Sequence, residues 1–198
     1  GFGTGFLIGH DQIMTNNHLI SNKEIAVRSF AEFNYEQGSS GEHLPSFRFS
    51  LNPEIFHTSP FEELDYTIVG INFDHSETEI SQSQWGHLYL NPDATPVPNE
   101  HVIVIQHPNG GLKQIALTAN RVVNTRSQYI YYTTDTMPGS SGSPIFNDLW
   151  QVIGIHHAYG GIKQDNQNNN FYANEGILMS HIKLDAQDFW PVYPKSTL

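Results

Sequence analysis

The chain has 198 residues and no cysteine, so disulfides, thiolate metal sites and a cysteine nucleophile are excluded. Its formal charge is −11, with only nine Lys and Arg residues, which argues against nucleic acid or an anionic membrane as a partner. No stretch is apolar over about 18 residues, so no membrane-spanning helix is predicted. A hydrophobic content of 38% predicts a packed core, in one domain or two small subdomains.

The chain begins at Gly1, without an initiator methionine or an apolar leader. We interpret it as an excised domain or a mature fragment, with any targeting signal or fused domain outside it. A chain without cysteine fits a reducing cytosol, but bacterial secreted enzymes also manage without disulfides, so the compartment stays open.

Short segments rich in β-branched and aromatic residues, bounded by Gly, Pro, Asn or Ser, predict strands along most of the chain. The first group of expected strands is 5–9, 12–15, 25–35, 47–51 and 66–73. The second group is 101–107, 113–124, 128–134, 144–146, 150–157 and 176–179. Two groups of about six strands predict an all-β fold of paired antiparallel barrels, although the pattern alone does not distinguish barrels from a sandwich.

A polar stretch separates the two groups and gives the best internal boundary. Within a single domain over 1–198, we therefore expect a first barrel at 1–75, a connecting stretch at 76–100 and a second barrel at 101–179. Ile182, Ala186 and Phe189 share a face, which predicts a helix over 180–190 that Pro191 ends. The asparagine-rich stretch 163–174 is predicted to be a mobile loop.

The stretch TTDTMPGSSGSPIF at 133–146 has a glycine- and serine-rich centre with the composition of a flexible linker. Strand-like segments lie on both sides of it, however, so a short turn that presents Ser141 is favoured. Two other motifs lie far away in the sequence. His18 follows TNN after the first strand pair, and Asp65 opens the buried segment DYTIV.

Serine, histidine and aspartate can act together in nucleophilic catalysis. A serine hydroxyl is a poor nucleophile unless an imidazole takes its proton, and a carboxylate must orient that imidazole. The carbonyl under attack needs N–H donors for its developing oxyanion, and glycines let backbone N–H groups converge there. Each residue alone has an ordinary structural explanation. Their conjunction, in the order His18, Asp65 and Ser141 within an all-β chain, favours catalysis.

On these residues the sequence resembles the chymotrypsin-like serine proteases, especially the disulfide-free bacterial-type branch that includes glutamyl endopeptidases. The motifs are GTGFLI…TNNHLI, LDYTIV, VIVIQHPNGGLKQIAL and GSSGSPIFN…WQVIGIHHAYGG, which together cover most of residues 3–182. A further strand that the family usually has before the first motif is largely missing. The resemblance implies two six-stranded antiparallel β-barrels, with the active site in the cleft between them.

The resemblance also implies the roles of the site residues. It makes the chain a serine endopeptidase that acts on protein or peptide substrates through an acyl-enzyme and without a cofactor. Ser141 is then the nucleophile, His18 the general base and acid, and Asp65 the residue that orients His18. The backbone N–H groups of Gly139 and Ser141 form the oxyanion hole.

Substrate-pocket residues are predicted on both sides of the nucleophile. Asp135 falls where trypsin-type enzymes place the carboxylate that binds Arg or Lys. Thr136 and His156 instead resemble the pair that holds a substrate carboxylate in glutamyl endopeptidases, and His157 and Tyr159 follow on the same strand. An imidazole would obstruct a long cationic side chain, so cleavage after acidic residues is favoured and cleavage after basic residues stays open.

Alternative functions stay open beside this one. A catalytically silent, protease-like binding module would keep the fold without the reaction. Another acyl hydrolase, such as an esterase, more often carries its serine in an α/β chain. The GFGTG start runs into a strand, which argues against a phosphate-binding loop. Adjacent histidines on a strand point to opposite faces, so His156 and His157 predict no metal site.

The residue before the nucleophile is the neutral Ser140. Digestive relatives carry there an aspartate that pairs with a newly cut N-terminus. We therefore expect this chain to set its oxyanion hole without that salt bridge.

Overall fold

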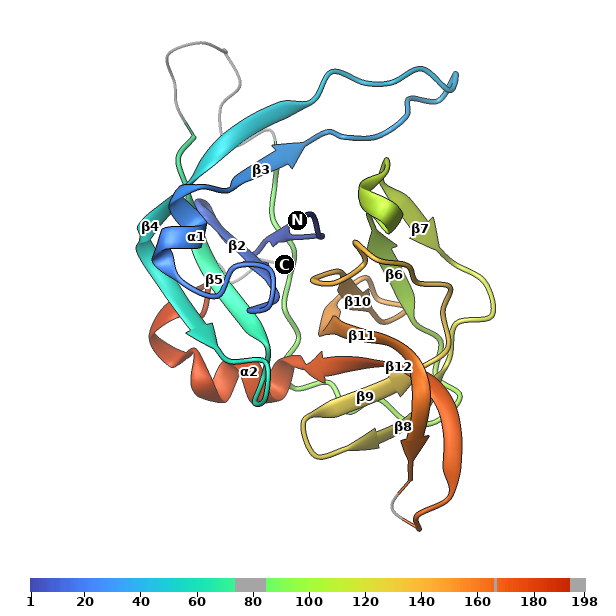
Figure 1. Ribbon diagram of the computed structural model, residues 1–198. Helices are drawn as coiled ribbons and strands as arrows, with labels where there is room; N and C mark the ends of the chain where they lie inside the picture. The colour runs from blue at the N-terminus through green and yellow to red at the C-terminus, as the bar shows by residue number, and fades with distance from the viewer. Residues whose placement is uncertain (74–84, 166, 193–198) are drawn as a thin grey trace, which may run out of the picture.

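The computed structural model describes residues 1–73, 85–165 and 167–192. It contains two antiparallel β-sheets that lie side by side, with a helix near the C-terminus below the first sheet and next to the second (Figure 1). The first sheet has the strand order β1-β2-β5-β4-β3, and the second has the order β7-β6-β10-β11-β12-β9-β8.

The strands of the first sheet are β1 (Phe6–Leu7), β2 (Gln12–Thr15), β3 (Phe30–Phe33), β4 (Phe47–Ser59) and β5 (Tyr66–Ile71). Those of the second are β6 (Ile103–Gln106), β7 (Gln114–Ala116), β8 (Val122–Arg126), β9 (Tyr129–Tyr132), β10 (Pro144–Phe146), β11 (Val152–Gln164) and β12 (Asn170–Leu178). The helical elements are α1 (Lys23–Val27), η2 (Pro108–Gly110), α2 (Met179–Asp185) and η3 (Gln187–Phe189).

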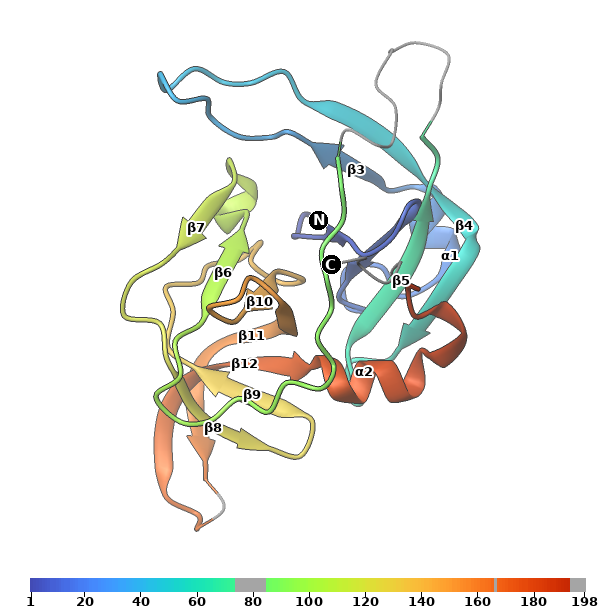
Figure 2. The same cartoon turned by 180° about the vertical axis from the view of Figure 1, so that it is seen from behind.

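The predicted all-β fold with two antiparallel units and a C-terminal helix is confirmed. Within the described residues the strands divide five and seven, where six in each unit were expected. The proposed boundary at 75 and the start of the connecting stretch fall on 74–84, outside the described residues. Seen from behind, the chain after residue 85 runs down between the two sheets before it enters the second (Figure 2).

Three local expectations were wrong. The expected single strand at 113–124 is two strands, β7 and β8, with residues 117–121 between them. The segment 23–27 is the helix α1 and not the start of a strand, because the Asn22 side chain accepts a hydrogen bond from the Ile25 N–H at 2.9 Å and caps the helix. The stretch 163–174 is mostly the end of a long hairpin, in which β11 and β12 pair from Gly154 to Gln164. Its turn is fixed because Asp165 accepts hydrogen bonds from backbone N–H groups of two following residues.

Three apolar clusters hold the molecule together. One lies inside the first sheet around Val69, and another lies inside the second around Ile130. The third joins the two, since Met14 and Ile68 of the first sheet pack with Ile155 of the second and with residues of α2. This shared core fixes how the facing edges of the two sheets lie, which is where the candidate catalytic residues are found.

A long arm between β3 and β4 also bridges the two halves (Figure 1). The Tyr35 carbonyl accepts a hydrogen bond from the Lys113 N–H at 2.9 Å, and Glu36 forms an ion pair with the Lys113 side chain. The Tyr35 ring stacks on His107, with 6.0 Å between ring centroids. Among the described residues, no helix has the length and apolar character needed to cross a membrane.

Candidate active site

His18 and Asp65 form a direct pair in the first half of the molecule. The Nδ1 atom of His18 lies 2.7 Å from Asp65 Oδ2, and the His18 backbone N–H donates to Asp65 Oδ1 at 2.9 Å. The Asp65 side chain is fully buried, whereas the His18 ring is 30% exposed. One edge of the imidazole is therefore fixed by a buried carboxylate, while the rest of the ring reaches solvent.

Asp65 is held by the backbone around it. It stands just before β5 with a φ of 40°, a left-handed conformation that Asp tolerates better than most residues. The buried Asn16 donates a hydrogen bond from its side-chain amide to the Asp65 carbonyl at 2.8 Å. Burial opposes ionisation of the Asp65 carboxyl, but hydrogen bonds from His157 and His18 outweigh it and lower the Asp65 pKa.

Ser141 lies on the turn between β9 and β10, and Thr4 clamps this turn from the first half. The Thr4 backbone N–H donates to the Ser141 carbonyl at 2.8 Å, and the Thr4 hydroxyl donates to the Gly139 carbonyl at 2.8 Å. Gly139 has a φ of +99°, and a Cβ there would lie 2.5 Å from the His107 carbonyl oxygen, so only glycine fits.

The turn and the His18–Asp65 pair meet through β11. The His156 backbone exchanges hydrogen bonds with Gly142 and Ser143 of the turn, at 3.0 and 2.8 Å. The next residue, His157, contacts Asp65 directly. Among the described residues neither the Ser141 hydroxyl nor His18 Nε2 has a hydrogen-bond partner, and catalytic hydrogen bonds are often long or unformed without substrate.

His157 lies against Asp65, a contact that the sequence did not predict. We expected it among the substrate-binding residues, but its ring is 7% exposed and its Nδ1 lies 2.7 Å from Asp65 Oδ2. The pairing of β11 with β12 shifts register between His156 and Ala158, so His157 lies at an irregularity of the strand.

His156 is buried against Tyr132, with 2.6 Å between its Nδ1 and the Tyr132 hydroxyl. Burial lowers the His156 pKa to about 3, with smaller contributions from the neighbouring imidazoles of His157 and His18. Burial also raises the pKa of Tyr132, so its phenol stays protonated and can donate to Nδ1. A neutral His156 that accepts at Nδ1 carries its proton on Nε2, which has no partner among the described residues.

The remaining predicted pocket residues have different environments. Thr136 donates from its hydroxyl to Asn174 Oδ1 at 3.2 Å, and the Asn174 amide donates to the Thr134 carbonyl at 2.6 Å. Asp135 is exposed, and its carboxylate forms no hydrogen bond within the described residues. Tyr159 is also exposed, at 68%.

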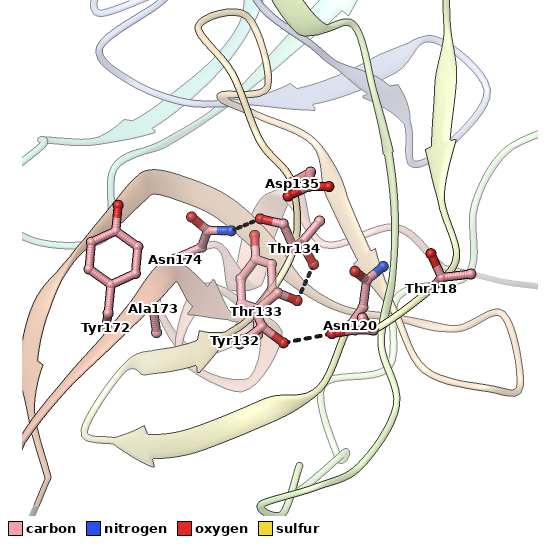
Figure 3. Close-up of a pocket in the computed structure, with 10 residues that line it drawn as sticks. Thr118, Asn120, Tyr132, Thr133, Thr134, Asp135, Tyr172, Ala173 and Asn174 are labelled. Carbon is pink, nitrogen blue, oxygen red and sulfur yellow. Dashed lines mark hydrogen bonds between the residues drawn. The ribbon is translucent and has the colours of Figure 1, made fainter.

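Asp135 lines a cavity of about 290 Å³ together with Thr134, Asn174 and the Tyr132 ring (Figure 3). His156 and Thr136 do not line this cavity. Asp135 lies at the edge of the labelled group (Figure 3). No contact joins Asp135 to the His156 imidazole within the described residues.

Four contributors to this site were not predicted from the sequence: Thr4, Tyr132, Asn174 and Glu175, the last of which contacts His157. Tyr132 and Asn174 belong to strands and read as ordinary sheet residues. Thr4 lies within the GTGF motif, which pointed to this segment of the chain. The motif did not predict that the Thr4 side chain contacts the turn that carries Ser141.

Two solved structures with a similar fold are forms of one protease. The chain matches the active form of the Rv3671c protease from Mycobacterium tuberculosis with a TM-score of 0.58 and 16% identity, covering 98% of this chain and 76% of that one. The inactive form matches with a TM-score of 0.56 and 16% identity, over 94% and 83% of the two chains. This likeness concerns the fold alone and places the molecule in the trypsin-fold class.

Sequence comparison gives the family. The family model of the trypsin-like peptidase domain matches residues 3–155, so the chain belongs to the trypsin-like peptidase domain family. The protein y4fB of Sinorhizobium fredii is 39% identical over 167 residues, which cover 79% of this chain and 25% of that protein.

Two further relatives are similar over most of the chain. The secreted RxLR effector protein 73 of Plasmopara viticola is 34% identical over 181 residues, covering 80% of this chain and 42% of that protein. A glutamyl endopeptidase of Staphylococcus epidermidis is 28% identical over 180 residues, covering 88% and 59%. The chain therefore spans less than two thirds of the length of each of these curated relatives.

Proposed function

We propose that this chain is a serine endopeptidase in which Ser141, His18 and Asp65 act as a catalytic triad. The observation that carries the proposal is the His18–Asp65 pair. Because Nδ1 donates to the buried carboxylate, the proton-free nitrogen of a neutral His18 is Nε2, the atom that a general base needs. Membership of the trypsin-like peptidase domain family supports the same assignment.

In the proposed reaction, the Ser141 Oγ attacks the substrate carbonyl carbon while its proton moves to His18 Nε2. The tetrahedral intermediate collapses, the C–N bond breaks, and His18 returns the proton to the leaving amine. Water then attacks the resulting ester with His18 again as base, and the proton passes back to Ser141 as the acid product leaves. Asp65 stays ionised and stabilises the imidazolium both when the acyl-enzyme forms and when it is hydrolysed.

The orientation of two peptide groups supports an oxyanion hole at Gly139 and Ser141. The Pro138 carbonyl accepts a hydrogen bond from the Asn109 N–H, and the Ser140 carbonyl accepts one from the Ser143 N–H at 3.0 Å. In a trans peptide the N–H points opposite to the carbonyl, so these bonds turn the N–H groups of Gly139 and Ser141 away. Neither N–H has an acceptor among the described residues, which leaves both for a substrate oxyanion.

The same proposal includes cleavage after acidic residues. A neutral His156 oriented by Tyr132 offers Nε2–H as a donor that suits a carboxylate, and the Thr136 hydroxyl can join it by turning away from Asn174 Oδ1, to which it donates in the structure. Asp135, which would bind Arg or Lys, makes no contact with His156 in the structure. The named activity of the Staphylococcus epidermidis relative is consistent with this preference.

A fluorophosphonate probe tests the nucleophile. The wild-type protein should gain one covalent adduct, and peptide mapping should locate it on Ser141. Ser141→Ala should abolish the adduct, and His18→Ala should slow its formation by several orders of magnitude, because the hydroxyl then lacks its base.

A remote His101→Phe variant serves as the control and should label at the wild-type rate. If intact-mass measurement finds no adduct on the folded wild-type protein, the enzyme proposal is wrong and a catalytically silent binding module is favoured.

A further inference from the structure

Asp65 accepts hydrogen bonds from two imidazoles and not one. Its Oδ2 atom lies 2.7 Å from His18 Nδ1 and also 2.7 Å from His157 Nδ1. The two rings come from different halves of the molecule, since His157 belongs to β11 and His18 follows β2. The buried carboxylate is therefore the point at which both halves contact one charge.

The far side of the His157 ring is held as well. Its Nε2 lies 3.4 Å from the Glu175 Oε1 on the neighbouring strand β12, and the other Glu175 oxygen accepts from the Lys163 ammonium at 3.0 Å. A chain of contacts thus runs from His18 through Asp65, His157 and Glu175 to Lys163. Carboxylates on opposite edges of the ring restrict its rotation, so Nδ1 is held in line with Asp65.

Aromatic side chains cover this chain of contacts. The Phe61 ring lies 4.8 Å from the His157 ring and 5.9 Å from the His18 ring, measured between centroids. Tyr129 lies 6.3 Å from His157 on another side. His157 is 7% exposed, so water has little access to the bond with Asp65. Hydrogen bonds to a charged group are stronger in such surroundings than in water.

From these contacts we propose that His157 is a positioning residue of the catalytic site, which keeps the Asp65 carboxylate oriented for its hydrogen bond with His18. Glu175 in turn keeps the His157 ring in place. This inference rests on the proposed function, because it assumes that Asp65 orients a catalytic imidazole. His157 touches neither the substrate nor Ser141 in this scheme and acts only through Asp65.

The physical consequence concerns both geometry and charge. Without His157, Asp65 Oδ2 loses one of its two N–H donors, and a buried carboxylate with fewer donors is free to rotate. A shift of about 1 Å in a catalytic group can cost about 100-fold in rate. The carboxylate charge that remains then acts more strongly on His18 and favours its protonated form.

Three variants test the role. His157→Phe removes the donor at similar volume, and we expect kcat to fall by about 10- to 100-fold with little change in KM. The acidic limb of its kcat/KM profile should move to higher pH. His157→Asn keeps an N–H donor near the position of Nδ1 and should recover part of kcat. Glu175→Gln should lower kcat by a smaller factor.

The chain supplies a matched control. His101 Nδ1 also lies 2.7 Å from a carboxylate oxygen, that of Asp148, on the surface of the second half of the molecule. His101→Phe removes the same kind of contact away from the site and should leave kcat, KM and the pH profile unchanged. A His157→Phe enzyme that folds and matches the wild type in kcat, or that changes only KM, would overturn the inference.

A measurement independent of turnover completes the test. In protein with ¹⁵N-labelled histidine, two exchange-protected imidazole N–H signals should appear far downfield, one from His18 and one from His157. Asp65→Asn should remove both from that region, and His157→Phe should remove one and shift the other. A single signal that His157→Phe leaves in place contradicts the contact. A folded wild-type protein without a fluorophosphonate adduct instead contradicts the proposed function itself.

Discussion

In the proposed function, the single buried side chain of His156 sets the preference for acidic residues. Its imidazole is neutral because burial makes the charged form costly, and Tyr132 occupies its Nδ1. The donor that remains, Nε2–H, suits a carboxylate and repels an ammonium or guanidinium group. The preference therefore depends on the tautomer of His156 as much as on its presence.

A peptide-library digest measures this preference. The wild-type protein should cleave after Glu or Asp, and His156→Leu should lower kcat/KM for these peptides by roughly 10- to 100-fold, the effect of losing a hydrogen bond to a charged group. Tyr132→Phe should cause a smaller loss, because Nδ1 and Nε2 can then exchange their roles. Asp135→Ala should have little effect.

The opposite pattern would contradict this interpretation. Cleavage after Arg or Lys that is lost in Asp135→Ala and retained in His156→Ala would assign the pocket to basic residues. The two variants therefore distinguish a pocket in which His156 binds an acidic residue from one in which Asp135 binds a basic residue. His156 is the one of these two side chains that contacts Tyr132 in the structure.

The proposed site residues that the sequence points to are those with a short local pattern around the reactive atom. Ser141 lies among glycines, and Asp65 stands immediately before an apolar strand, so each could be found without knowledge of its partners. The environment of His157 could not be found in this way. Whether its ring meets a substrate or Asp65 depends on how β11 faces the other half of the molecule, which is a tertiary contact between residues 92 positions apart.

At the scale of elements, the segment before β1 links the two halves of the molecule. Thr4 is buried there and donates to the turn with both its backbone and its side chain, while Thr15 of β2 donates from its hydroxyl to the Thr4 carbonyl at 2.7 Å. Ser140 is buried and accepts from the Met137 N–H at 3.0 Å. These bonds fix the turn within the described residues without a buried ion pair at Ser140.

Thr4→Val tests this clamp, because it replaces the hydroxyl by a methyl group of similar size and leaves the Gly139 carbonyl without its donor. We expect kcat to fall by about 10-fold or more with a smaller change in KM, since the oxyanion hole acts mainly in the transition state. Thr4→Ser retains the hydroxyl and should keep most of the activity. Equal activities of Thr4→Val and Thr4→Ser would show that the side chain has no such role.

The elements that could be predicted were those with a strong local pattern. β2 and β10 were predicted with the bounds they have, because each is a short run with clear turn residues on both sides. α1 was missed, since its Ile25 and Val27 favour strands and only the Asn22 cap signals a helix. The outer part of the β11–β12 hairpin was predicted as a loop because its residues are polar. Exposed strands on a protruding hairpin, however, need no alternation of apolar residues.

At the scale of the whole molecule, the buried histidines couple stability to pH. Burial lowers the pKa of His156 from its ordinary value of 6.5 to about 3, and burial also lowers the pKa of His107. Below about pH 6.5 the unfolded chain binds protons at these positions that the folded protein does not bind. Unfolding is therefore favoured increasingly as the pH falls through this range.

Asp65 and His101 change the stability of the fold with pH in a different way from the buried histidines. The pKa of Asp65 is lowered, so the stability it contributes is present above its ordinary value of 3.8 and is lost only when the pH falls through its still lower folded value. The hydrogen bond that His101 donates to Asp148 raises the pKa of His101, which adds stability at low pH, but this pair is largely exposed and screened by solvent. Between pH 7 and 5, His156 should therefore dominate among these groups.

Urea unfolding at pH 7 and pH 5 measures the effect. From pH 6.5 to 5, one histidine kept neutral by burial costs the fold about 2 kcal/mol, at roughly 1.4 kcal/mol per pH unit. His156→Leu removes the titrating group, so its free energy of unfolding should change less between the two pH values than that of the wild type, by about this amount. His101→Phe should not flatten the dependence, because the folded-state pKa of His101 is raised and its contribution has the opposite sign. If His156→Leu and the wild type lose equal stability, His156 takes up a proton in the folded protein at pH 5. In that case the neutral imidazole on which the proposed acidic preference depends would not exist there.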